Sequence, residues 1–181
     1  MAPAAEAFVL AWGDLGGQWG VNRSIAQIHA YLYLQGEPVT ADRIATVFGM
    51  ARSNVSTSLR ELMAWNLVRR VPVRGERRDH FEAETDVWEI AARIAEGRKA
   101  REIDPALAAL RAAVARADEG TTPLERTRLE AMLAFTEDLD RWYGQVLSLP
   151  RSKLEAILRL GGRIAALLPS GRRGGGDARG G

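Results

Sequence analysis

The sequence contains no cysteine, so disulfide bonds and thiolate metal sites are excluded. It has two histidines, His29 and His80, and neither is accompanied by side chains at metal-ligand spacing, so each is expected to be structural or exposed. No uninterrupted apolar run approaches the ~20 residues that a membrane-spanning helix needs. The first residues also lack the basic segment of a secretory signal. We therefore expect a cytoplasmic protein with no metal and no cofactor.

The patterns of catalysis are missing as well. No nucleophile stands with a partner base, and the glycine pairs Gly16-Gly17 and Gly161-Gly162 are not followed by the pattern of a phosphate-binding loop. We therefore do not expect an enzyme.

Lysine is scarce, and arginine supplies nearly all of the positive charge. Of the 25 basic residues only Lys99 and Lys153 are lysines, and the whole chain carries a net charge of +2. Between residues 52 and 78, seven arginines stand against two glutamates, a net charge of +5. This concentration of positive charge in one stretch indicates a phosphate-bearing partner such as nucleic acid.

Residues 40–62 have the pattern of a helix-turn-helix. Thr40 can cap a first helix, and Gly49 permits the positive φ of a tight turn. Ala45 is small enough for a second helix to approach closely, and Val55 is the apolar contact from that second helix. The remaining buried positions at helical spacing are Ile44, Val47, Leu59 and Leu62.

The other face of the second helix is rich in Ser, Thr and Asn. These residues are mediocre helix formers, so a binding function is the better reason for their presence. Such side chains reach base edges and phosphates when a helix N-terminus enters the major groove, whereas the alternative is a merely solvated face. The predicted DNA-binding side chains of this helix are Arg52, Ser53, Asn54, Ser56, Thr57 and Arg60.

A β-hairpin is predicted directly after this helix. Residues 68–73 are β-branched, residues 74–79 form a charged turn, and residues 80–84 alternate polar and apolar side chains. Pro72 cannot donate to a ladder, so its strand is an edge or its amide position faces outward. Val39 is expected to add a third strand. Together with the helix-turn-helix, the hairpin forms a winged helix. The arginines of the wing are also predicted to bind DNA, and the alternative is that they are merely solvated charges. These residues are Arg74, Arg77 and Arg78.

The flanking aromatic residues can be interpreted in more than one way. A helix at residues 6–19 carries a stripe of Phe8, Val9, Trp12, Leu15 and Trp19. Its tryptophans are expected in the core, with a dimer contact or an aromatic ligand cage as alternatives. Asn22 is expected to cap the next helix, and Trp65 to close the core beneath the wing.

The second half of the chain is predicted to be helical. A helix from about residue 87 should end at Asp104-Pro105, where another begins. Further helices should start at capping boxes, one of Thr122 with Glu125 and one of Ser152 with Glu155.

The helix after Thr122 is the predicted dimer interface. Apolar residues repeat along it at the 3-4 interval of a coiled coil, and the alternative is packing within the chain onto the final helix. These residues are Met132, Phe135, Leu139, Trp142 and Val146. The predicted fold class is mainly α with a small β-hairpin, divided into a winged helix-turn-helix domain at 1–85, a helical dimerisation region at 86–168 and a disordered tail at 169–181.

Residues 17–105 resemble the GbsR family of winged-helix regulators, a branch near the MarR repressors. The matching pieces are G-Q-W-G, R-S-N-V-S-T-S-L-R-E-L, G-E-R-R-D-H-F-E-A and V-W-E-I. The family often has Ser where this chain has Ala51, at the expected N-cap of the recognition helix. The loss of the capping hydrogen bond costs about 1 kcal/mol of stability. The resemblance implies a homodimeric bacterial or archaeal transcription factor, usually a repressor.

Two functional expectations follow. The homodimer would bind double-stranded DNA at a near-palindromic operator, with the recognition helix in the major groove and the wing on the adjacent groove. The alternative is a winged-helix adaptor between proteins without specific DNA binding, because a fold alone does not decide function. Since some relatives respond to choline or glycine betaine, the resemblance also permits a quaternary ammonium effector, with candidate aromatic walls at Trp12, Trp19, Tyr31, Trp88, Trp142 and Tyr143.

Overall fold

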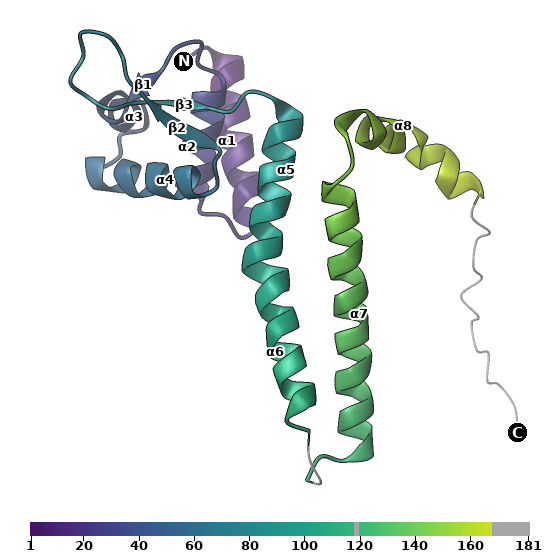
Figure 1. The fold of residues 1–181 in the computed structure, drawn as a ribbon. Helices are drawn as coiled ribbons and strands as arrows, with labels where there is room; N and C mark the ends of the chain where they lie inside the picture. The colour runs from purple at the N-terminus through teal and green to yellow at the C-terminus, as the bar shows by residue number, and fades with distance from the viewer. Residues whose placement is uncertain (118–119, 168–181) are drawn as a thin grey trace, which may run out of the picture.

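The computed structural model describes residues 1–117 and 120–167, with side chains up to Leu160. Along the chain the elements are α1 (Pro3–Gln18), α2 (Arg23–Tyr33), β1 (Val39–Thr40), α3 (Ala41–Phe48), α4 (Arg52–Ala64), β2 (Val68–Val71), β3 (His80–Ala83), α5 (Val87–Arg98), a π-helical turn (Lys99–Ile103), α6 (Asp104–Ala115), α7 (Pro123–Leu147) and α8 (Arg151–Leu167). Figure 1 shows a winged helix built from α1 to β3 and a long arm, in which α5 and α6 run end to end beside α7. The predicted fold class, mainly helical with a small antiparallel sheet, is confirmed.

The sheet has the order β1-β3-β2, with both pairs antiparallel. Val39 lies opposite Phe81, so the third strand predicted at Val39 is confirmed. The first hairpin strand is shorter than predicted because Pro72, directly after β2, has no amide to donate. Of the two alternatives given for Pro72, an edge strand or an amide position that faces outward, the structure shows the first, since β2 lies at the edge of the sheet. Phe81 and Val68 are buried, so one face of the sheet belongs to the core.

The helix-turn-helix has the local structure that the sequence predicts. Thr40 caps α3 by accepting a hydrogen bond from the Arg43 amide (3.3 Å), and Gly49 has a φ of 61° in the turn. Val55 is fully buried in the core, together with Ile44, Leu59 and Leu62, as predicted. Val47 is only partly buried. Ala51 occupies the cap position of α4 and offers no side-chain hydrogen bond, as expected.

The first helix packs differently from the prediction. Val9 is its one buried large apolar side chain, whereas Phe8 and Leu15 are exposed and Trp19 is 59% exposed. The core interpretation is therefore wrong for Trp19, whereas Trp12 is partly buried and packs against the core. The helix meets α2 through its glycines instead, because a Cβ at Gly16 would stand 2.5 Å from Ala26. The predicted cap of α2 is confirmed, since the side chain of Asn22 accepts a hydrogen bond from the Ser24 amide (2.9 Å).

A new helix, α6, begins at Asp104 as predicted, but the arm does not break there and Asp104 is not a cap, so that part of the prediction is wrong. The chain passes from α5 to α6 through the π-turn Lys99–Ile103, where the Asp104 amide donates to the Lys99 carbonyl five residues earlier. Pro105 has no amide for the usual bond to residue 101. The wider spacing of the π-turn directly before it lets the helix continue past the proline.

The last two helices start differently. The capping box of Thr122 and Glu125 is confirmed: the Glu125 amide donates to Thr122 Oγ1 (3.3 Å), and the Thr122 amide donates to Glu125 Oε2 (2.8 Å). The second predicted box is wrong, because α8 begins at Arg151 and Ser152 lies inside it. Glu155 binds the Arg151 side chain instead (2.8 Å).

The tail predicted at 169–181 lies outside the described residues, and the division of the chain at residues 85 and 86 stays a prediction. Among the helices described, none combines the length and the apolar content that crossing a membrane requires.

Candidate nucleic-acid interface and junction cavity

The polar side chains predicted to bind DNA lie together on the free side of α4. Arg52, Ser56 and Arg60 follow one another at intervals of four and form one ridge, and Ser53 and Thr57 form the next. All of these side chains are exposed except Ser56, which is partly buried. Asn54 is also exposed, but the residue one turn further along the same side of α4 is the buried Ser58. Asn54 therefore lies at the edge of this surface.

Two of the arginines on this surface already have partners. Arg52 donates to Asp42 of α3 (2.7 Å) and to Ser56 (2.5 Å), and Arg60 donates to Thr57 (3.1 Å). The pair between Arg52 and Asp42 is half-exposed on both sides, so it contributes about 0–1 kcal/mol. Sequence reasoning missed this contact, which joins the starts of the two helices. A phosphate can replace so weak a partner.

The wing arginines Arg74, Arg77 and Arg78 are all exposed in the turn between β2 and β3, where Gly75 has a φ of 84°. Arg78 is paired with Glu76 (3.1 Å). Within the described part of the chain, Arg74 and Arg77 make no hydrogen bond or ion pair. Figure 1 shows this turn and α4 extending on the same side of the molecule, away from the arm. The two predicted DNA-binding segments are therefore brought to one side.

Helix α7 carries two stripes. One faces the rest of the arm and consists of partly or fully buried residues at Leu129, Leu133, Thr136, Asp140, Tyr143 and Leu147. The predicted dimer residues form the neighbouring stripe: Met132, Phe135 and Trp142 are 55%, 64% and 56% exposed, and Leu139 and Val146 are partly buried. Within the part of the chain whose side chains are described, then, Met132, Phe135 and Trp142 of this stripe stay uncovered, whereas Leu139 and Val146 are covered in part.

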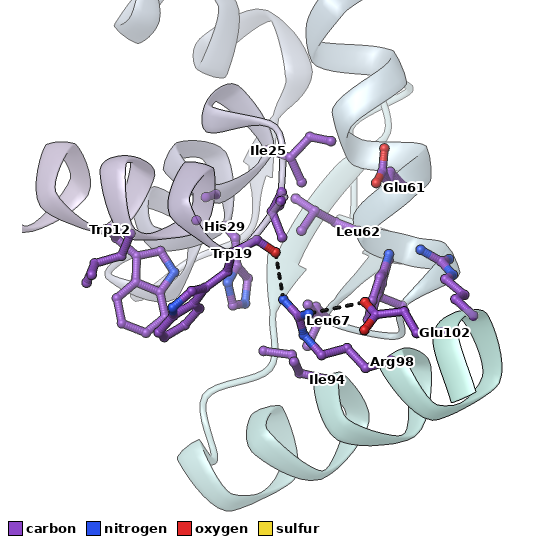
Figure 2. Close-up of a pocket in the computed structure, with 17 residues that line it drawn as sticks. Trp12, Trp19, Ile25, His29, Glu61, Leu62, Leu67, Ile94, Arg98 and Glu102 are labelled. Carbon is purple, nitrogen blue, oxygen red and sulfur yellow. Dashed lines mark hydrogen bonds and ion pairs between the residues drawn. The ribbon is translucent and has the colours of Figure 1, made fainter. Parts of the chain in front are cut away.

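A cavity of about 240 Å³ lies where the winged helix meets the arm (Figure 2). We call it the junction cavity. Its lining comes from α1, α2, α4, α5 and the π-turn, with mostly apolar walls and charged groups supplied by the arm and by Glu61: Trp12, Leu15, Gly16, Trp19, Gly20, Val21, Ile25, Ala26, His29, Glu61, Leu62, Trp65, Leu67, Ile94, Arg98, Arg101 and Glu102.

Of the six candidate aromatic walls, only Trp12 and Trp19 line this cavity. Tyr31 is buried edge-to-face against Phe48, at 5.5 Å between ring centres. The other candidates lie on the arm: Trp88 is 5.9 Å from the guanidinium of Arg151, and Trp142 and Tyr143 contact each other. The six residues therefore do not form one cage.

The third aromatic wall is Trp65, which sequence reasoning placed beneath the wing. Trp65 is partly buried and packs against the core, and it also lies against α5, where a Cβ on Gly97 would stand 2.4 Å from its ring. The guanidinium of Arg101 lies 4.0 Å from the centre of the same ring. A glycine inside a helix is the sequence signal that could have indicated a bulky neighbour at this point.

Both histidines are buried, so the structural interpretation holds for each. His80 donates a hydrogen bond from Nδ1 to the Arg78 carbonyl (2.9 Å). His29 differs, because its Nε2 is buried with no hydrogen-bond partner among the described residues. Burial lowers the pKa of His29 from 6.5 to about 4, so the ring is neutral at physiological pH.

Comparison with known proteins finds relatives of the winged helix. Residues 19–79 match the family model described as MarR family. The chain is 24% identical over 71 residues to YvaV of Bacillus subtilis (strain 168), a protein provisionally named an HTH-type transcriptional regulator. That alignment spans 39% of this chain and 40% of YvaV, so the match covers less than half of either protein.

A solved structure has the same fold over more of the chain. A crystal structure described as a transcriptional regulator superposes with a TM-score of 0.62 at 20% identity, covering 80% of this chain and 96% of that one. MepR of S. aureus, in a structure of a point mutant bound to an oligodeoxyribonucleotide, aligns with a TM-score of 0.38 at 15% identity, over 91% of each chain. The chain thus has a winged helix-turn-helix fold, and residues 19–79 of it are similar to the MarR family. These matches do not single out the GbsR branch.

Proposed function

We propose that this protein is a cytoplasmic transcriptional regulator that binds DNA sequence-specifically as a homodimer, acting as a repressor at a near-palindromic operator. The observation that carries the proposal is the exposed polar surface of α4, which lies on the same side of the molecule as the wing arginines. The match of residues 19–79 to the MarR family model and the name of YvaV support it.

The proposed mechanism is geometric. The two copies of α4 enter successive major grooves about 34 Å apart. Ser53, Asn54, Ser56 and Thr57 face base edges, while Arg52 and Arg60 bind phosphate or guanine. The wing reaches the adjacent groove, where Arg74, Arg77 and Arg78 contact the backbone or a narrow A·T-rich minor groove.

The dimer contact of the proposal is the exposed stripe of α7 from Met132 to Val146. A regulator that binds two half-sites needs a partner copy, and this stripe offers large apolar side chains that the described chain leaves uncovered.

A small-molecule effector in the junction cavity is also part of the proposal. The resemblance permits a quaternary ammonium compound. Among the indoles that line the cavity, Trp65 already stacks on Arg101, which leaves Trp12 and Trp19 for such a cation. We propose only where the effector binds, which is the junction cavity.

The test is DNA affinity measured by fluorescence anisotropy with the chain's own promoter and with random DNA. The variant carries alanine at Ser53, Asn54, Ser56 and Thr57, and its helix content and dimer mass are checked separately. We expect the preference for the promoter over random DNA to disappear. If a folded, dimeric variant binds the promoter as tightly as the unmodified chain, this surface does not read DNA and the protein-adaptor function is favoured.

A further inference from the structure

The polar surface of α4 carries two arginines, and within the described residues only Arg52 has a carboxylate partner. Its Nε donates to Asp42 Oδ1 (2.7 Å), whereas Arg60 donates to the hydroxyl of Thr57 (3.1 Å). Asp42 stands in the first turn of α3 and Arg52 is the first residue of α4, so the pair joins the starts of the two helices. A negative charge on a surface proposed to bind DNA repels phosphate, so its presence needs an explanation.

The guanidinium of Arg52 is held at a second point. Its Nη1 donates to Ser56 Oγ (2.5 Å), one turn further along α4. A guanidinium has five N–H donors, so the bonds to Asp42 and Ser56 leave three, all of them on the terminal nitrogens Nη1 and Nη2. Those two nitrogens form the end of the side chain that can make two parallel hydrogen bonds to O6 and N7 of a guanine.

A phosphate and a guanine would affect the pair between Arg52 and Asp42 differently. A phosphate bound to Arg52 brings a second negative charge close to Asp42, in an interface where less water screens the repulsion. A guanine offers two neutral acceptors, so Asp42 can keep its bond to Nε while the terminal nitrogens bind the base. Both side chains are half-exposed in the free protein (50% and 57%), so the pair contributes little to folding. A phosphate can still displace the carboxylate, but only against this repulsion.

We propose that Asp42 is a specificity-determining residue that positions Arg52 to bind a guanine in each half-site and makes Arg52 a poor partner for phosphate. Arg60, which lacks a carboxylate partner among the described residues, is then the phosphate contact of the same surface. The inference rests on the proposed function, because it requires α4 to enter the major groove. It decides between phosphate and guanine, the two roles that the proposed function leaves open for both arginines.

The first test replaces the guanines of the promoter one at a time by 7-deazaguanine, which lacks the N7 acceptor, and measures affinity by fluorescence anisotropy. With the unmodified chain we expect one position in each half-site to lose about tenfold, as the loss of one charged hydrogen bond predicts. Arg52→Ala should abolish the effect of the analogue at that position, and Asp42→Ala should reduce it, whereas Arg60→Ala should leave it unchanged. If no guanine is coupled to Arg52 in this way, the inference is wrong.

The second test measures how the binding of random DNA depends on salt. Asp42→Asn keeps an acceptor for Nε but removes the charge, so Arg52 becomes free to neutralise a phosphate. We expect tighter binding of random DNA and a slope of log K against log salt that steepens by ~0.9, the value for one phosphate contact. The steepening should disappear when Arg52→Ala is added. An unchanged slope in Asp42→Asn, or a steepening that persists without Arg52, contradicts the inference.

Asp14→Asn is the matched control for the lost charge. Asp14 of α1 pairs with Arg23 of α2 (3.0 Å) and is 59% exposed, so this pair resembles the one between Arg52 and Asp42 but joins two other helices. Asp14→Asn should change neither the slope nor the effect of 7-deazaguanine. Equal effects of Asp14→Asn and Asp42→Asn would mean that only the net charge matters, and would overturn the inference.

Two further outcomes separate this inference from the proposed function. If the Asp42 variants lose stability in urea unfolding but keep the slope and the response to 7-deazaguanine, Asp42 only joins the two helices and the inference fails, while specific DNA binding stands. If the unmodified chain binds neither the promoter nor random DNA, the proposed function fails and this inference fails with it.

Discussion

At the scale of single residues, His29 makes stability depend on pH in a defined direction. The unfolded chain takes up a proton at His29 near pH 6.5, whereas the folded chain resists protonation down to about pH 4. The unfolded state therefore binds more protons between these values, and the free energy of unfolding falls as the pH drops through this window. A shift of this size corresponds to roughly 3 kcal/mol.

The first prediction is that His29→Leu removes this part of the pH dependence. Urea unfolding at about pH 7.5 and about pH 4.5 should show a larger loss of stability for the unmodified chain than for the variant. Carboxylates that titrate in the same window are common to both proteins, so the difference isolates His29. An equal loss in the two proteins would mean that His29 is protonated in the folded state.

A second prediction at this scale concerns Asn54, which lies near the N-terminus of α4. There it can read a base or hold a phosphate, and its place at the side of the polar surface makes the choice informative. Asn54→Ala should raise helix propensity and leave the fold intact. If Asn54 reads adenine, promoter affinity falls by about 1–3 kcal/mol while random DNA is nearly unaffected. Equal losses on both DNAs would instead assign it to phosphate.

At the scale of elements, the contact between α4 and α5 depends on Gly97. A Cβ there would stand 2.4 Å from the Trp65 ring, so Gly97→Ala should lower the free energy of unfolding by about 1–3 kcal/mol. Gly144 is the matched control, because it is also helical but has open space around its Cα. Gly144→Ala should stabilise the protein by about 0.5–1 kcal/mol. Chemical denaturation compares the two, and a tolerated Gly97→Ala would show that Trp65 is free to move.

The wing is the second element for which the structure refines a prediction. Arg77→Ala with Arg78→Ala should weaken promoter and random DNA together and reduce the slope of log K against log salt by about 2, at ~0.9 per phosphate contact. If Arg78 stays paired with Glu76 in the complex, Arg78 contributes less to the slope than Arg77 does. Arg77→Ala alone should therefore give about half of the reduction in slope or more. Arg116→Ala serves as the control for a lost surface charge. An unchanged slope in the double variant would exclude phosphate contacts by both side chains.

The sequence predicts those elements whose causes are local. Thr40 and Gly49 define α3 and the turn after it, because a cap and a positive φ depend on a few neighbouring residues. Val55 follows from its spacing to the same turn. The cavity depends on contacts between distant segments, and Trp65 could not be placed against α5 from its own surroundings. The motifs at Asp104-Pro105 and at Ser152 were also not sufficient by themselves. At Asp104-Pro105 the preceding π-turn compensates for the proline, and at Ser152 the expected partner Glu155 is bound by Arg151 instead.

At the scale of the whole molecule, the oligomeric state tests the interface. Leu139→Asp with Trp142→Asp places two charges on the exposed stripe of α7 and should yield monomers in light scattering. Ala134→Asp with Gln145→Asp is the control, because both residues are exposed on the face of α7 away from the two stripes. A dimer that survives the first pair, with helix content unchanged, would place the interface elsewhere.

The π-turn also fixes the rotational phase of the arm. It holds one residue more than the α-helical turn that it replaces, and each helical residue rotates the chain by about 100° and advances it by about 1.5 Å. The direction in which α7 presents its exposed stripe, relative to α4, is thus set by that additional residue. In a homodimer the same phase would decide how the two copies of α4 face each other. A one-residue deletion within Lys99–Ile103 would therefore change which operator spacing the dimer can span, although every side chain proposed to contact DNA would be intact.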